Sequence, residues 1–233
     1  MPRIPRLNGT TLALVAVFAA LIAASTIWGG YPLGSGVPIT LQTFAVVLTG
    51  LALGAYRGAA AVALYVVLGS IGLPIFAKHA TGATVWPGPT AGFLVGFVVA
   101  AFVAGWAAER VARSPRATFA GFLGAGTLTI PVIYAIGLPV MAARLHIPLF
   151  ANPAGCDAVS LDWASGCVNA TTGGLIGFLP GDLLKVILAA IVATAIFAAY
   201  PHILAGEPNA ATASPEELSA RPVARAKAGA SKK

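Results

Sequence analysis

Long apolar runs, separated by short links containing glycine and proline, dominate this chain. Six runs have about the length that a helix needs to cross the hydrocarbon core of a bilayer, which is roughly 20 residues with a range of about 17–25. They cover residues 11–28, 37–56, 58–77, 89–108, 119–141 and 180–200. The pattern predicts an all-α fold, an integral membrane bundle of six transmembrane helices.

The composition agrees with a membrane protein. Hydrophobic residues make up 58% of the chain and charged residues 9%, with a mean hydropathy of +0.88, whereas soluble domains carry about 25% charged residues. We expect a short cytoplasmic segment over residues 1–10 and a membrane domain over 11–202. The tail over 203–233 is rich in Ala, Pro, Glu, Lys and Arg, and we expect it to be a disordered, basic cytoplasmic segment.

Basic residues predict the orientation. With an even number of spans and both termini cytoplasmic, eleven of the 14 Lys and Arg residues fall on the cytoplasmic side, as the positive-inside rule requires. They are Arg3, Arg6, Arg57, Arg110, Arg113, Arg116, Arg221, Arg225, Lys227, Lys232 and Lys233. The same bias explains the net charge of +7 without a nucleic-acid partner.

Two ionisable residues stand at the head of the last run. Asp182 and Lys185 lie three apart in the stretch 178–185, FLPGDLLK, so on a helix they share one face. Charges at membrane depth are costly and mark functional cavities. If the helix begins at Pro180, the pair lies at its outer end. We interpret it as a site for a small polar or anionic solute, with an ion pair that only locks two helices as the alternative.

Further polar and aromatic residues lie at the same outer level. The second run opens with Thr40, Gln42 and Thr43, where Gln42 is a candidate ligand contact and the threonines also suit bonds within their own helix turn. The connection between the third and fourth runs has the length of a lid. It carries Phe76, Thr81 and Trp86. An aromatic side chain there suits an apolar ligand ring, although Trp86 also suits an anchor at the membrane interface.

Taken together, these motifs resemble the BioY family, the biotin-specific capture components of energy-coupling-factor vitamin transporters. The matching stretches are VPITLQTF at 37–44, LPIF at 73–76, GPTAG at 88–92 and FLPGDLLK at 178–185. The resemblance implies a vitamin pocket at the outer end, lined by Asp182 and Lys185 and closed by the loop after the third span. The apolar bicycle, urea and carboxylate of biotin match aromatic residues, a hydrogen-bond acceptor and a cation. Which end of biotin meets Lys185 stays open.

The resemblance also implies partners. In that family a membrane coupling subunit, docked on two ATPases, contacts alanine rows on the first span; here Ala16, Ala20 and Ala24 form such a row. Rows of small residues let helices approach closely, so ordinary packing within the bundle is the alternative. A solitary biotin transporter without ATPases is the alternative function.

Enzyme signatures are absent from the sequence. No lysine follows a glycine, so there is no phosphate-binding loop, and an intramembrane hydrolase finds no base near Ser35. We expect no catalytic residue, no cofactor and no metal site. The outer loop before the last span, longer than the family pattern, carries Cys156 and Cys167, and two cysteines in one extracytoplasmic loop predict a disulfide.

Overall fold

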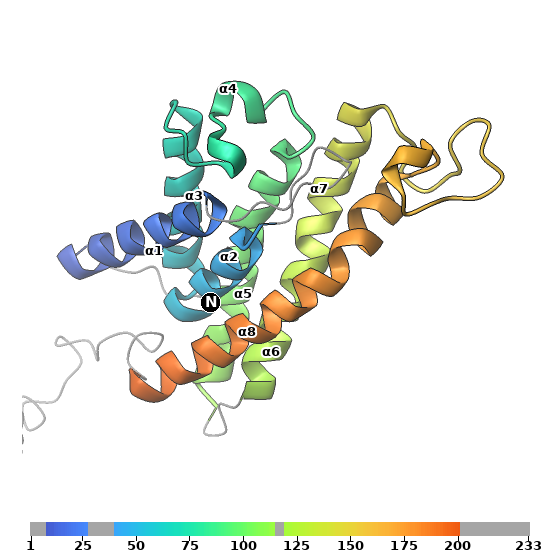
Figure 1. The fold of residues 1–233 in the computed structure, drawn as a ribbon. Coiled ribbons are helices and arrows are strands. Elements are labelled where there is room, and N and C mark those ends of the chain that lie inside the picture. The colour runs from blue at the N-terminus through green and yellow to red at the C-terminus, as the bar shows by residue number, and fades with distance from the viewer. Residues whose placement is uncertain (1–7, 28–39, 115–118, 201–233) are drawn as a thin grey trace, which may run out of the picture.

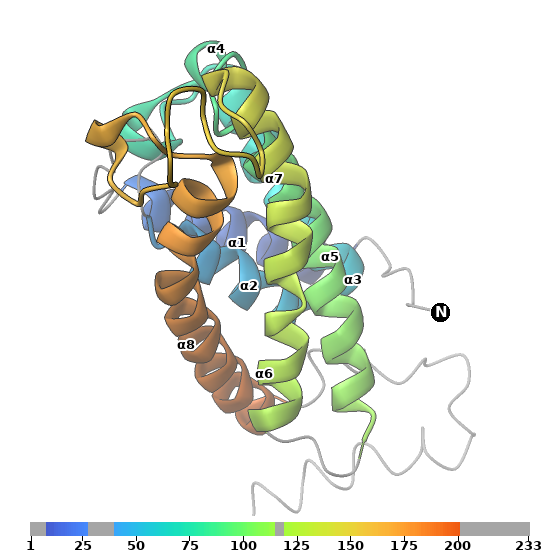
Figure 2. The same ribbon diagram turned by 90° about the vertical axis from the view of Figure 1, so that its right-hand side faces the viewer.

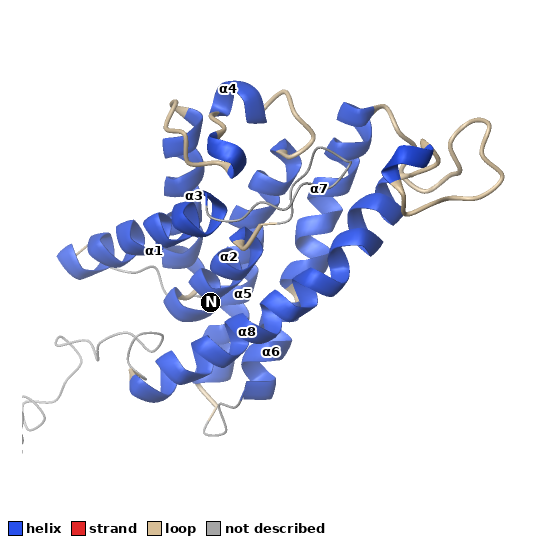
Figure 3. Ribbon diagram, viewed as in Figure 1, coloured by secondary structure: helices blue, strands red, loops and turns tan. Residues whose placement is uncertain are grey.

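The computed structural model describes residues 8–27, 40–114 and 119–200, and this part of the chain is helical with no strand (Figure 3). The α-helices are α1 Gly9–Ile27, α2 Gln42–Leu53, α3 Ala55–Ser70, α4 Gly82–Val85, α5 Ala91–Ala112, α6 Phe119–Thr127, α7 Thr129–Leu145 and α8 Gly177–Ala199. Short 3-10 turns η1 Ala77–His79 and η2 Trp163–Ser165 and a π-helical turn η3 Thr171–Ile176 complete the order. The tail expected over 203–233 and most of the segment 1–10 lie outside the described residues.

Four segments of the described chain are long and apolar enough to cross a membrane: Gly9–Ile27, Ala91–Ala112, Phe119–Leu145 and Thr171–Ala199. The second and third predicted spans correspond to α2 and α3, which are apolar but have only 12 and 16 residues. At 1.5 Å per residue these helices are about 18 and 24 Å long, less than the roughly 30 Å of the hydrocarbon core. The all-helical prediction is therefore confirmed, whereas the count of six spans stays a prediction.

The last predicted helix begins earlier than expected. It does not start at Pro180; α8 starts at Gly177 and continues the π turn that opens at Thr171, so Pro180 lies inside the helix. The whole helical segment, Thr171–Ala199, has 29 residues, more than an untilted span requires. The π turn changes the pattern of backbone hydrogen bonds just before Pro180. Pro180 has no backbone N–H group, so one helical hydrogen bond is missing there in any case.

The fifth predicted span is divided into α6 and α7, which follow one another at Leu128 (Figure 2). The proline at position 131 has no N–H group for the carbonyl of Thr127, the last residue of α6. At the third position of α7 that missing donor costs little, because the first turn of a helix has free N–H groups anyway. The proline thus fixes the point at which one helix ends and the next begins.

Small residues let α2 and α5 form the centre of the bundle (Figure 1). Every residue of α2 except Phe44 is buried. The chain reverses into α3 at Gly54, whose φ of 83° favours glycine. A Cβ atom at Gly105 of α5 would overlap the Gly54 carbonyl carbon, and Glu109, one turn further along α5, accepts the N–H of Ala55 at 2.9 Å. The turn is therefore held directly on α5.

One face of α1 packs on the bundle and the other is free within the described structure. Ala19, Ile22 and Thr26 are buried against its neighbours, and α1 makes its main contacts with α3 and α2 (Figure 1). The predicted alanine row faces away: Ala16, Ala20 and Ala24 are all exposed. The three alanines are thus not used for packing within the described bundle.

Candidate ligand site

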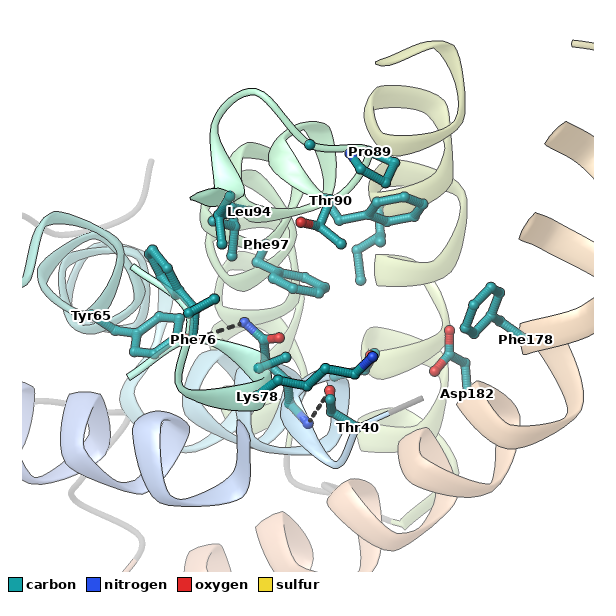
Figure 4. Close-up of a pocket in the computed structure, with 18 of the residues that line it drawn as sticks. Thr40, Tyr65, Phe76, Lys78, Pro89, Thr90, Leu94, Phe97, Phe178 and Asp182 are labelled. Atoms are coloured by element: carbon teal, nitrogen blue, oxygen red, sulfur yellow. Dashed lines mark hydrogen bonds between the residues drawn. The ribbon is translucent and has the colours of Figure 1, made fainter. Parts of the chain in front are cut away.

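A cavity of about 280 Å³ lies at the end of the bundle where α5 and α8 begin (Figure 4). Its walls come from the start of α2, from α3, α5, α7 and α8, and from the connection between α3 and α5. It is near the lower end of the range for small-molecule sites, about 300–1,000 Å³. The lining residues are Thr40, Gln42, Thr43, Tyr65, Phe76, Ala77, Lys78, Ala80, Thr84, Val85, Gly88, Pro89, Thr90, Phe93, Leu94, Phe97, Ile133, Tyr134, Phe178, Asp182 and Lys185.

Asp182 and Lys185 form a buried ion pair in the wall of this cavity. The Lys185 ammonium lies 2.9 Å from Asp182 Oδ1, and the two residues are only 8% and 6% exposed. Removing two such charges from water costs several kcal/mol per ion, so each charge needs a close partner and further hydrogen bonds. The spacing of three residues on α8 provides the partner, as the sequence predicts.

Tyr134 of α7 provides the further hydrogen bond. Its hydroxyl donates to Asp182 Oδ2 at 2.5 Å, so both carboxylate oxygens have a protein donor. The ring of Phe93 packs against the Tyr134 ring edge-on, with centroids 6.2 Å apart. The sequence analysis missed Tyr134. The available signal was a single phenol within an apolar run, since a buried hydroxyl needs a hydrogen-bond partner.

A second polar cluster forms the opposite wall. The Gln42 side-chain amide donates to the Tyr65 hydroxyl at 3.1 Å, and that hydroxyl lies 3.4 Å from Thr26 Oγ1 of α1 and 3.4 Å from the Ile75 carbonyl oxygen. The Thr40 hydroxyl oxygen accepts the Gln42 backbone N–H at 3.2 Å, and Thr40 also lines the cavity. The cluster therefore joins α1, α2, α3 and the following connection at the cavity.

Aromatic rings supply most of the remaining surface. Phe76 contacts Tyr65 edge-on with centroids 5.4 Å apart and is 2% exposed. The sequence analysis missed three further phenylalanines that line the cavity, namely Phe93, Phe97 and Phe178. A site with two polar clusters on apolar, aromatic walls suits a ligand that has an apolar body and polar groups at its ends.

Two predicted contacts do not line the cavity. Trp86 is 37% exposed, and its indole N–H donates to Ser70 Oγ at 3.0 Å on the outside of the connection. Thr81 stands at the N-cap of α4, where its carbonyl oxygen accepts the N–H groups of Thr84 and Val85. The sequence predicted that Phe76, Thr81 and Trp86 belong to one lid over the ligand. Of these three, only Phe76 points into the cavity, where its ring packs on Tyr65.

The loop between α7 and α8 extends away from the helices (Figure 1). Cys156 and Cys167 are joined there in a disulfide, with Cα atoms 5.7 Å apart. Asn169 fastens the base of the loop: its side-chain N–H group donates to the Phe150 carbonyl at 2.9 Å, and its side-chain oxygen accepts the Thr172 N–H at 2.8 Å. The loop is thus covalently closed beside the start of η3, and its residues do not line the cavity.

The long apolar helices define a multi-pass membrane protein, and its partly open cavity has the size and lining of a candidate site for a small ligand. The model of the BioY family matches residues 3–202. The chain is 42% identical over 196 residues to the biotin transporter BioY of Rhodobacter capsulatus, covering 83% of this chain and 96% of that protein. It is 37% identical over 182 residues to the biotin transporter BioY of Thermotoga maritima, covering 78% and 92%.

A solved structure shows the same fold. It is the S-component for biotin from an ECF-type ABC transporter, with a TM-score of 0.67 and 24% identity, covering 80% of this chain and 90% of that one. The family match spans nearly the whole described structure, including every residue that lines the cavity. This chain belongs to the BioY family.

The disulfide gives a direct prediction for the purified protein. Because the cysteines share one loop and are paired in the structure, native protein should contain no reactive thiol. Intact mass should rise by the mass of two hydrogens on reduction, and an alkylating reagent should label both cysteines only after reduction. Cys156→Ser, which leaves Cys167 unpaired, is the control that should be labelled without reduction. Two thiols labelled in fresh native protein would contradict the pairing.

Proposed function

We propose that this protein captures biotin from the outside of the cell membrane as the substrate-binding subunit of an energy-coupling-factor transporter. The observation that carries the proposal is the buried Asp182–Lys185 pair in an aromatic cavity. The proposal is supported by the family to which the chain belongs, because its relatives are named biotin transporters.

The chemistry of the cavity suits biotin. The bicyclic body is apolar, and Phe93, Phe97 and Phe178 offer it apolar contact. The urea both donates and accepts hydrogen bonds. Among the described residues, Asp182 accepts two hydrogen bonds from protein groups, and an ionised carboxylate has about four acceptor positions. It therefore retains capacity for urea N–H groups, while Lys185 is a donor for the urea oxygen.

The proposed orientation puts the cavity on the outer side. Arg57 lies near the start of α3, and Arg110 and Arg113 lie at the end of α5. These helix ends are at the opposite end of the bundle from α4 (Figure 1), whose residues Thr84 and Val85 line the cavity. Basic residues favour the cytoplasmic side, so we assign both termini to the cytoplasm. In this arrangement α2 and α3 are shorter members of a six-helix bundle, and their connection at Gly54 faces the cytoplasm.

Substitution of the ion pair tests the site. Asp182→Asn and Lys185→Ala should each weaken biotin binding about ten-fold or more, because a hydrogen bond to a charged group contributes about 1.5–3 kcal/mol. Isothermal titration of purified protein measures the loss. Asp157→Asn is the matched control, since it makes the same change in the outer loop, away from the cavity. Wild-type affinity in both cavity variants would reject this site.

The exposed alanine row is the proposed contact with the transmembrane coupling subunit, which would carry two ATPase subunits. Its members, Ala16, Ala20 and Ala24, offer a flat strip on which another helix can approach closely. The buried side of the same helix carries Thr26, which contacts the polar cluster at the cavity. The helix that we assign to the partner is thus also connected to the ligand site.

A bulky side chain in the row tests this contact. Ala20→Trp should abolish co-purification with the ATPase module and leave biotin affinity nearly unchanged, because the row faces away from the cavity. Ile191→Trp is the control, since Ile191 is an exposed position on α8 and a tryptophan there should keep the complex.

Loss of biotin binding with a retained complex would reverse the assignment of the alanine row. If no ATPase module co-purifies with the wild type, and cells lacking that module still take up biotin, the protein is a solitary transporter.

A further inference from the structure

The cavity carries one positive charge more than its ion pair accounts for. Of the residues that line it, three belong to charged types, namely Asp182, Lys185 and Lys78. The first two neutralise one another at 2.9 Å, and Tyr134 donates to the same carboxylate. The net charge of the lining is therefore carried by Lys78. A monoanionic ligand would balance it.

Lys78 lies at the edge of the cavity, opposite the ion pair. It is the middle residue of η1, between α3 and α4, and it is exposed. Figure 4 shows its side chain reaching across the cavity in the direction of Asp182. No hydrogen bond or ion pair to Lys78 occurs in the described structure. Its ammonium group is thus available to a ligand, in contrast to that of Lys185.

The backbone holds Lys78 in an unfavourable conformation. Its φ and ψ are 59° and 32°, in the left-handed region, and His79 follows with a φ of 59°. Residues with a Cβ atom seldom adopt this region, and two in succession need support from their surroundings. Phe76 supplies it: its N–H donates to the Ala80 carbonyl at 3.2 Å while its ring packs on Tyr65. A strained turn that directs a free cation into a cavity is typical of a ligand contact.

We propose that Lys78 binds the carboxylate of the ligand, while Asp182, Lys185 and Tyr134 bind the polar group at its other end. This inference rests on the proposed function and assigns the direction of biotin in the site. The urea meets the neutral ion pair, and the acid on the flexible arm meets Lys78 at the edge. The assignment follows from charge, because the ammonium of Lys185 already has an anionic partner.

The test compares biotin with biotinamide, which has the same ring and arm but no charge. Wild-type protein should bind biotin about five-fold more tightly than biotinamide, a modest preference because the contact is exposed to solvent. Lys78→Met, which keeps the length of the side chain and removes its charge, should reduce the preference to about two-fold or less. Lys78→Arg should restore it. Titration calorimetry of each variant with both ligands gives the ratios.

The controls separate the charge from the fold. His79→Ala changes the neighbouring strained residue, which does not line the cavity, and should keep the wild-type preference. Lys185→Met should weaken both ligands alike. For the wild type, rising salt should weaken biotin more than biotinamide, because an exposed charge is screened. This last measurement needs no variant.

Each outcome decides a different claim. If the wild type prefers biotin and Lys78→Met keeps that preference, or if Lys185→Met removes it, the carboxylate does not bind at Lys78 and the inference is overturned. If the wild type binds biotin and biotinamide equally and without salt dependence, the inference is also wrong, although biotin binding stands. If the wild type binds neither ligand, the proposed function itself fails.

Discussion

The ion pair between Asp182 and Lys185 is the constraint on which the site depends. Two charges in an apolar bundle are stable only where each finds its partner and the remaining acceptor sites are used. Position on one helix supplies the first condition, and Tyr134 of α7 supplies part of the second. The unused acceptor capacity of Asp182 then faces the cavity. The same requirement that makes the pair costly thus leaves it suited to a polar ligand, the role we propose for it.

The cavity also depends on close packing elsewhere. Glycines such as Gly54 and Gly105 bring α2 and α5 together, so that α2 lies in the centre of the bundle and begins at the cavity wall with Gln42. From there, contacts pass through Tyr65 to Thr26 on α1. One polar cluster therefore belongs to the elements that carry the proposed partner surface, and the other belongs to α7 and α8. A ligand between them contacts both groups of helices.

The sequence predicted features that follow from local chemistry, and it missed those that require three dimensions. The spacing of Asp182 and Lys185 and the apolar runs are local, so the shared helix face of this pair and the helices were predicted. The pairing of Tyr134 with Asp182 joins residues 48 positions apart, and no local pattern indicates it. Trp86 was predicted as a ligand contact because a loop sequence does not show which side chains point into the cavity. Pro180 was read as a helix start because the preceding π turn has no sequence signature.

A double-mutant cycle tests the central claim that the ion pair acts as one unit in binding. Biotin affinity is measured by titration for the wild type, Asp182→Asn, Lys185→Met and the double variant. If the pair acts together, the losses should fail to add by about 1 kcal/mol or more. Losses that add within about 0.3–0.5 kcal/mol, the range for independent sites, would contradict the account.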